Sequence, residues 1–149
     1  MSATSATSSI VAIDASLAMR IILPTPSSPD VERLFAEWRE AGARVISSML
    51  WLAESVSAIR KAVFARAITD SEGRDALADL LRLGVEPVAI DPDQCHSALQ
   101  WAERLGQSRA YDGFYLGLAE KLGAPLWTAD KRLANAARRL GMNWVHSVD

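Results

Sequence analysis

The sequence predicts an α/β protein with three layers, in which a short, mostly parallel sheet lies between two layers of helices. Segments with the pattern of strands alternate with segments with the pattern of helices along the chain. The predicted strands are short apolar runs, as expected for strands that are buried on both faces. With 149 residues, 50% of them hydrophobic, the chain can bury one good core. Such an alternation is typical of parallel strands covered by helices.

Three strands and three helices are expected in the first half of the chain. A Ser/Pro/Asp start signal and a glycine stop bound one helix, and Thr69 or Asp70 caps another. Pro87 indicates that the third strand is short or lies at an edge of the sheet. The expected strands are a β-branched run that ends at Asp14, residues 43–48 and residues 85–91, and the expected helices are 25–42, 47–67 and 69–84.

The second half continues the alternation with three helices and two strands. Pro92 in the first turn and Gly106 after the last turn bound the first of these helices. The expected helices are 91–106, about 110–121 and about 130–140, and the expected strands are 125–128 and 143–147.

Composition and charge limit the classes of function. Residues 1–9 are small and polar and predict a flexible tail before a domain at 10–149, with neither a secretory signal nor a membrane span. Cys95 is the only cysteine, which excludes a disulfide framework and a thiolate metal site and fits a reducing cytoplasm. A net charge of −2 excludes binding of nucleic acid by a basic surface alone. Cations would have to mediate part of any contact with a polyanion.

Four acidic residues stand in otherwise apolar surroundings: Asp14, Glu54, Asp112 and Asp130. Asp14 and Asp130 follow predicted strands, and open α/β sheets bind ligands at the carboxyl ends of their strands. Each acid also has a purely structural interpretation. Asp14 could form a turn, Asp112 and Asp130 could cap helices or favour their first turns, and Glu54 could lie on the surface.

Taken together, the four acids favour a metal site. Crowded carboxylates repel one another unless a divalent cation lies among them, and an all-oxygen set is typical of Mg²⁺ or Mn²⁺. Ser16 and Thr128 could bond a carboxylate or a metal-bound water, although local turns and caps are the more common use of such hydroxyls. The sequence has no glycine-rich phosphate loop and no nucleophilic Ser or Cys with a spaced His partner. Metal ions held by carboxylates can hydrolyse a phosphodiester.

A resemblance to a known family covers about residues 10–147. It is carried by four segments in this order: "VAIDAS", "SSMLWLAESVSAI", "AYDGFYLGLAEKLGAPLWTADKRL" and "GMNWVHSVD". In this order they resemble the PIN-domain nucleases, in particular the VapC-type toxins of bacterial toxin–antitoxin pairs, and the third segment is the most specific. The resemblance implies an α/β/α fold and a Mg²⁺- or Mn²⁺-dependent endoribonuclease with an RNA substrate, a small cognate antitoxin, a homodimer and a cytoplasmic location.

The resemblance also implies roles for individual residues. It places Asp14, Glu54, Asp112 and Asp130 in the family's acidic quartet, in which Glu54 binds the metal directly or through water, and it makes Ser16 and Thr128 the supporting hydroxyls. Four basic residues close in sequence to the acids are candidates for contacts with the RNA backbone, with solvated surface charge as the alternative: Arg20, Arg109, Lys131 and Arg132.

One departure from the family's pattern concerns two glycines in the predicted helix at 110–121. Gly113 and Gly117 stand where that helix more often has alanine, which predicts a loss of helix stability of up to roughly 1 kcal/mol each.

Two alternatives remain beside the nuclease. Aspartyl-phosphate phosphatases also use Mg²⁺ on an α/β fold, but they need a second Asp two residues after the first, where this chain has Ser16. A non-catalytic PIN-like scaffold could bind RNA or a partner protein without cutting. The four intact acids favour the nuclease.

Overall fold

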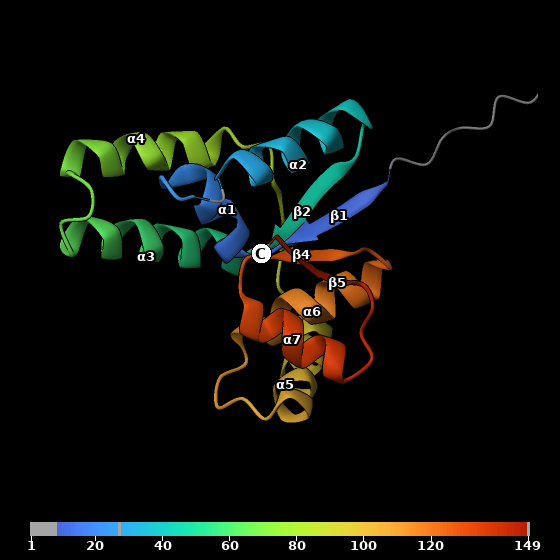
Figure 1. The fold of residues 1–149 in the computed structure, drawn as a ribbon. Helices are drawn as coiled ribbons and strands as arrows, with labels where there is room; N and C mark the ends of the chain where they lie inside the picture. The colour runs from blue at the N-terminus through green and yellow to red at the C-terminus, as the bar shows by residue number, and fades with distance from the viewer. Residues whose placement is uncertain (1–8, 27, 149) are drawn as a thin grey trace, which may run out of the picture.

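A five-stranded sheet organises the computed structural model, which describes residues 9–26 and 28–148 (Figure 1). Its strands are β1 (Ile10–Ile13), β2 (Arg44–Ser48), β3 (Glu86–Val88), β4 (Leu126–Thr128) and β5 (Val145–Ser147). Their order is β3-β2-β1-β4-β5 and every neighbouring pair is parallel. The predicted parallel α/β architecture is therefore confirmed. The strand order reverses at β1, which places the carboxyl ends of β1 and β4 side by side at the point where such sheets bind ligands.

Helices lie on both sides of the sheet (Figure 1). One group comprises α1 (Ala15–Ile22), α2 (Ser28–Glu40), α3 (Leu50–Phe64) and α4 (Asp70–Leu81), and the other comprises α5 (Pro92–Leu105), α6 (Tyr111–Leu122) and α7 (Lys131–Arg139). The paired helices α3 and α4 extend beyond the carboxyl ends of the strands. Thr69 caps α4 in a full capping box, and β3 is the short edge strand that its proline predicts.

A missed helix and a shifted helix start are the main differences from the expected elements. Helix α1 was not predicted, because only Asp14 separates it from β1 and its mostly apolar residues continue the apolar run of that strand. A run this short shows too little periodicity to distinguish a helix from a strand. Helix α3 begins at Leu50 rather than at Ser47, since Ser47 and Ser48 are buried residues of β2.

The core forms around β1, whose residues Val11, Ala12 and Ile13 are all buried. Large apolar side chains such as Leu17 and Leu116 are fully buried against it, each contributing about 1.5–3 kcal/mol relative to an exposed position. This core holds the central strands, and with them the residues that follow β1 and β4, in fixed positions.

The two glycines of α6 allow it to pack closely against α5. An added Cβ at Gly113 would lie 2.3 Å from the carbonyl oxygen of Ala98, and one at Gly117 would lie 2.9 Å from Ser97 Cβ. The expected loss of helix propensity therefore accompanies a close helix contact that alanine would prevent. This contact fixes the start of α6, next to Asp112.

The predictions of a flexible tail and of no membrane span concern other parts of the chain. The tail, residues 1–9, lies outside the described residues except for Ser9, whose carbonyl accepts a hydrogen bond from Arg44 N–H at 2.8 Å. Within the described ranges, no helix has both the length and the apolar character needed to span a membrane.

Candidate active site

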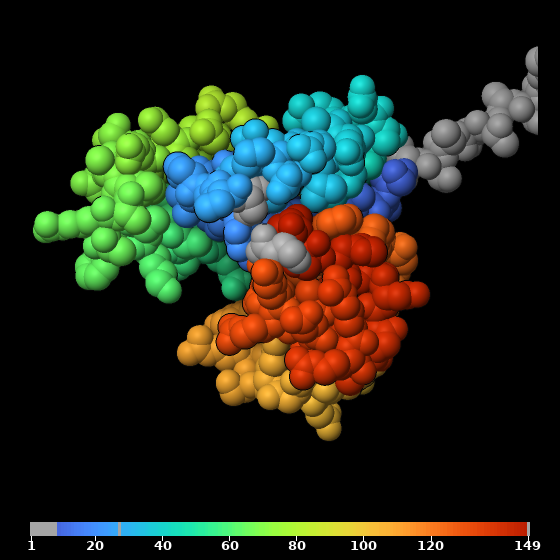
Figure 2. All heavy atoms as spheres, in the orientation of Figure 1, coloured from blue at the N-terminus to red at the C-terminus, as the bar shows by residue number. Residues whose placement is uncertain are grey.

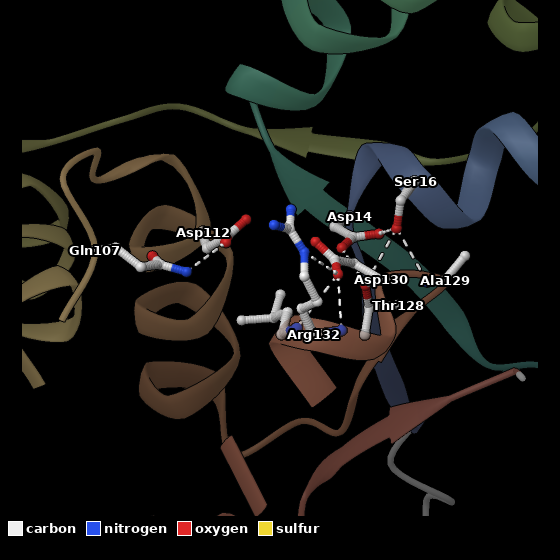
Figure 3. Close-up of polar contacts among 9 residues, drawn as sticks. Asp14, Ser16, Gln107, Asp112, Thr128, Ala129, Asp130 and Arg132 are labelled. Carbon is white, nitrogen blue, oxygen red and sulfur yellow. Dashed lines mark hydrogen bonds and ion pairs between the residues drawn. The ribbon is translucent and has the colours of Figure 1, made fainter. Parts of the chain in front are cut away.

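Asp14 and Asp130 follow the neighbouring strands β1 and β4, and each caps the helix that comes next (Figure 3). Asp14 Oδ1 accepts a hydrogen bond from Leu17 N–H at 3.1 Å. Asp130 Oδ1 accepts from Arg132 N–H at 2.9 Å and from Leu133 N–H at 3.3 Å. The structural interpretation of these acids as helix caps is thus confirmed for Asp130 and also holds for Asp14. Capping takes up one oxygen of Asp130 and does not remove its charge from the site.

Two hydroxyls hold the buried carboxylate of Asp14, which is 4% exposed. Ser16 Oγ donates to its Oδ1 at 2.6 Å, and Thr128 Oγ1 donates to its Oδ2. Burial raises the pKa of Asp14 to about 6, against the lowering effect of the two hydroxyls and of Leu17 N–H, while the charge of Asp112 raises it further. Ser16 and Thr128 therefore both bond to this carboxylate, one of the uses that the sequence leaves open for them.

Glu54, in the second turn of α3, is held by a tyrosine that the sequence analysis did not single out. Tyr115 is 2% exposed, and its hydroxyl donates to Glu54 Oε1 at 2.6 Å. Burial raises the pKa of Glu54, the bond from Tyr115 lowers it, and the charge of Asp112 raises it. Burial and the contact with Glu54 raise the pKa of Tyr115 well above its ordinary value, so the phenol remains a neutral donor. A buried tyrosine hydroxyl needs a hydrogen-bond partner, so a tyrosine on an apolar helix face is the sequence signal that could have pointed to this contact.

Asp112 lies in the first turn of α6 and faces Asp14 and Asp130 from the opposite side (Figure 3). The residue at the cap position is Ala110, which makes no side-chain cap, so Asp112 is not the helix cap. Gln107 Nε2 donates to Asp112 Oδ2 at 2.9 Å, a second contact that the sequence analysis missed. Burial raises the pKa of Asp112, the bond from Gln107 lowers it, Asp130 raises it and Arg132 lowers it.

A pocket of about 800 Å³ joins three of the acids, Glu54, Asp112 and Asp130. Figure 2 shows the surface hollowed between α3 and the orange-red part of the chain that contains α7. Asp14 lies buried beside this pocket, close enough for Asp112 to raise its pKa. The charges of these acids thus act on one another, as expected for acids that share a site.

Two of the four predicted basic residues line the pocket, and the other two do not. Arg109 and Arg132 belong to its lining, whereas Arg20 and Lys131 are outside it. The side chain of Arg132 extends between Asp112 and Asp130, with its Nε 3.9 Å from Asp130 Oδ1 (Figure 3). Arg132 also lowers the pKa of Asp112, so one guanidinium acts on both acids.

The donor set fits a hard divalent cation that keeps part of its water shell. All candidate ligands are carboxylate oxygens, which Mg²⁺ and Mn²⁺ prefer. Within residues 9–26 and 28–148, no three acid, His or Cys side chains gather closely enough to enclose an ion by themselves. Mg²⁺ commonly binds through only one or two carboxylates and completes its shell with water and substrate phosphate.

Comparisons with known proteins agree with this architecture. The sequence profile of the PIN domain family matches residues 11–139. Ribonuclease VapC12 of Mycobacterium tuberculosis is 34% identical over 131 residues, which cover 85% of this chain and 92% of that protein. VapC20 of the same species, described as a sarcin–ricin loop cleaving toxin, superimposes with a TM-score of 0.64 at 19% identity, covering 86% of this chain and 95% of that one.

A toxin–antitoxin complex from Klebsiella pneumoniae contains a chain with a similar fold. It superimposes with a TM-score of 0.63 at 14% identity, covering 93% of this chain and 98% of that one. At these identities, the two solved structures establish the shared fold.

Proposed function

Because the chain belongs to the PIN-domain family, we propose that it is a divalent-metal-dependent endoribonuclease and the toxin of a bacterial type II toxin–antitoxin pair. The observation that carries the proposal is the meeting of Glu54, Asp112 and Asp130 in one pocket beside the buried Asp14. The ribonuclease relative, 34% identical over most of both chains, supports the chemistry.

Each acid is held by a donor that fixes its orientation, which supports the following roles. Asp14, Asp112 and Asp130 would hold a Mg²⁺ or Mn²⁺ ion, some of them through its water shell because no three of these side chains meet closely enough to ligate one ion directly in the described ranges, and Glu54 would bind it directly or through water. When bound, such an ion lowers the pKa of a water and offsets negative charge on the phosphate.

The chain's own part in the reaction is to position groups and to accept a proton. The hydrogen bond from Tyr115 engages Glu54 Oε1 and leaves Oε2 for a water. Glu54 can take the proton that this water gives up as it attacks the phosphorus, while the P–O bond to the leaving oxygen breaks and that oxygen takes a proton from solvent. The hydrogen bond from Gln107 engages Asp112 Oδ2, so Asp112 would bind the metal ion through Oδ1. Arg109 and Arg132 can bind the phosphates of RNA on either side of the cut.

The partners follow from the same family assignment. A small cognate antitoxin would neutralise the toxin by covering the pocket, since the related Klebsiella structure is a toxin–antitoxin complex. We also propose a homodimer and a cytoplasmic location, where RNA is available. A non-catalytic scaffold would not need four acids each held by hydrogen bonds, three of them with raised pKa values.

Expression in a bacterium that lacks the antitoxin tests the toxin assignment. The parent chain should arrest growth, and coexpression of the small protein encoded beside it should restore growth. Asp112→Asn should abolish the arrest, whereas Asp93→Asn should preserve it, because Asp93 is an exposed acid in the first turn of α5 and lies outside the pocket. Arrest by the Asp112→Asn chain at equal expression would contradict the proposal.

A further inference from the structure

The pocket extends away from the acids along α7 and is lined there by a second arginine of that helix. Arg132 and Arg139 both line it, with Asn135 and Ala136 between them. Residues seven apart lie on the same face of a helix about two turns apart, roughly 10.5 Å along its axis. Arg139 therefore lies at the end of the pocket away from Asp130, on the same side of the pocket as Arg132.

No acid among the described residues accounts for the position of Arg139. In the described ranges, no carboxylate lies within ion-pair distance of Arg139 or of Arg109. Arg139 Nε donates to the carbonyl oxygen of Asn135 at 3.4 Å, which leaves its terminal nitrogens available. Both Arg138 and Arg139 favour the carboxyl end of α7 through the helix dipole, but only Arg139 lines the pocket.

The chemistry of this part of the pocket fits an unpaired nucleic acid strand. Guanidinium groups bind phosphate through paired hydrogen bonds, and aromatic rings stack on unpaired bases. Tyr111, which is 50% exposed, lines the same pocket. A pocket of about 800 Å³ has the size of a small-molecule site, which suits a short single-stranded segment and not a duplex.

On these grounds we infer that Arg139 binds a backbone phosphate of single-stranded RNA, on a path that runs from the acids along α7. Arg132 binds a phosphate nearer the cut, and Tyr111 stacks on a base of the same segment. The inference rests on the proposed nuclease function and adds to it the residue that holds the strand at a distance from the cut.

Binding of a labelled single-stranded RNA at several salt concentrations tests the inference directly. Fluorescence anisotropy is measured in Mg²⁺ on the Asp112→Asn protein, so that the strand stays intact, as a gel confirms. Adding Arg139→Ala should weaken binding about 5- to 10-fold and reduce the slope of log affinity against log salt by about 0.7, the value for one lost phosphate contact. Adding Arg138→Ala, which removes the same charge one residue away, should leave the slope unchanged.

Activity gives a second, independent readout. Arg139→Ala in the otherwise parental chain should raise KM for a long substrate and leave kcat nearly unchanged. The effect should vanish for an oligonucleotide too short to reach Arg139, because the truncated strand lacks the phosphate concerned.

The outcomes separate this inference from the proposed function. If the parent cuts RNA but Arg139→Ala and Arg138→Ala have the same effect on RNA binding, the inference is wrong and the proposed nuclease function is retained. If binding depends on Arg139 but the parent cuts no RNA, the phosphate site stands and the nuclease is wrong. Failure of the protein to bind single-stranded RNA would overturn the inference. If Arg139→Ala changed only neutralisation by the antitoxin, the inference would also be wrong, and Arg139 would have a role in docking the partner protein.

Discussion

The hydroxyl of Tyr115, on α6, donates a 2.6 Å hydrogen bond to Glu54 Oε1, on α3. The backbone of Ala15, the residue that follows Asp14, lowers the pKa of this phenol, and the charge of Asp14 raises it. One buried phenol thus binds Glu54 and lies near enough to Asp14 to feel its charge. Its pKa is raised well above the ordinary value, so it acts as a fixed neutral donor and not as a titrating group.

Tyr115→Phe tests this connection. Loss of the hydroxyl leaves Glu54 without its donor and should lower kcat about 10-fold and the free energy of unfolding by about 1–2 kcal/mol. Steady-state cleavage rates and urea unfolding measure the two effects. Tyr111→Phe is the matched control, because it removes a hydroxyl from the same helix and keeps the exposed ring. Equal kcat values for the two variants would show that Tyr115 does not position Glu54.

The raised pKa of Asp14 predicts how stability depends on pH in the absence of divalent ions. Because this carboxyl binds its proton more tightly when folded, with a pKa of about 6 against 3.8, its contribution to stability falls as pH rises from about 4 to about 6. Asp14→Asn keeps a side chain that can cap α1 and should remove up to about 3 kcal/mol of this pH dependence. Urea unfolding from pH 4 to pH 7.5 compares the two proteins. Parallel pH profiles would show that Asp14 is not the buried acid described here.

Binding of a divalent ion should stabilise the folded protein by mass action. Millimolar Mg²⁺ or Mn²⁺ should raise the melting temperature of the parent more than KCl of equal ionic strength. Asp112→Asn should reduce this rise, while the metal-free variant should be as stable as the parent or slightly more so, since a repelling charge is lost. Asp93→Asn should keep the full rise. A melting temperature that ignores both ions in the parent would count against the metal site.

We expect alanine at the glycines of α6 to lower the free energy of unfolding, although alanine has the higher helix propensity. Gly113→Ala should gain about 1 kcal/mol of propensity, but its Cβ would meet the backbone of Ala98 at 2.3 Å, and the net change should be a destabilisation of roughly 1–3 kcal/mol. At Gly117 the obstacle is Ser97 Cβ, so Ser97→Gly should rescue Gly117→Ala and should not rescue Gly113→Ala. Thermal unfolding of the single and double variants measures this. Stabilisation by Gly113→Ala would contradict the close α5–α6 contact.

The sequence was sufficient to predict features that depend on residues near one another in the chain. Strand-end acids such as Asp14 and Asp130 converge because parallel strands end at one edge of the sheet. The start of α4 could be predicted because Thr69 begins a local capping pattern. The contacts of Tyr115 and Gln107 and the place of Arg139 in the pocket lining were missed, because they depend on how segments fold against one another. Helix α1 was missed because its apolar run continues that of β1.

Cleavage of RNA by the purified chain tests the central claim most directly. The parent, and the control Asp93→Asn, should cut single-stranded RNA with Mg²⁺ or Mn²⁺, and EDTA should stop the reaction. Asp14→Asn and Asp112→Asn, each shown by circular dichroism to be folded, should cut on the order of 10²-fold more slowly or less, because each loses a carboxylate of the site. Cutting at the parental rate by both folded variants would show that the four acids are not the catalytic site.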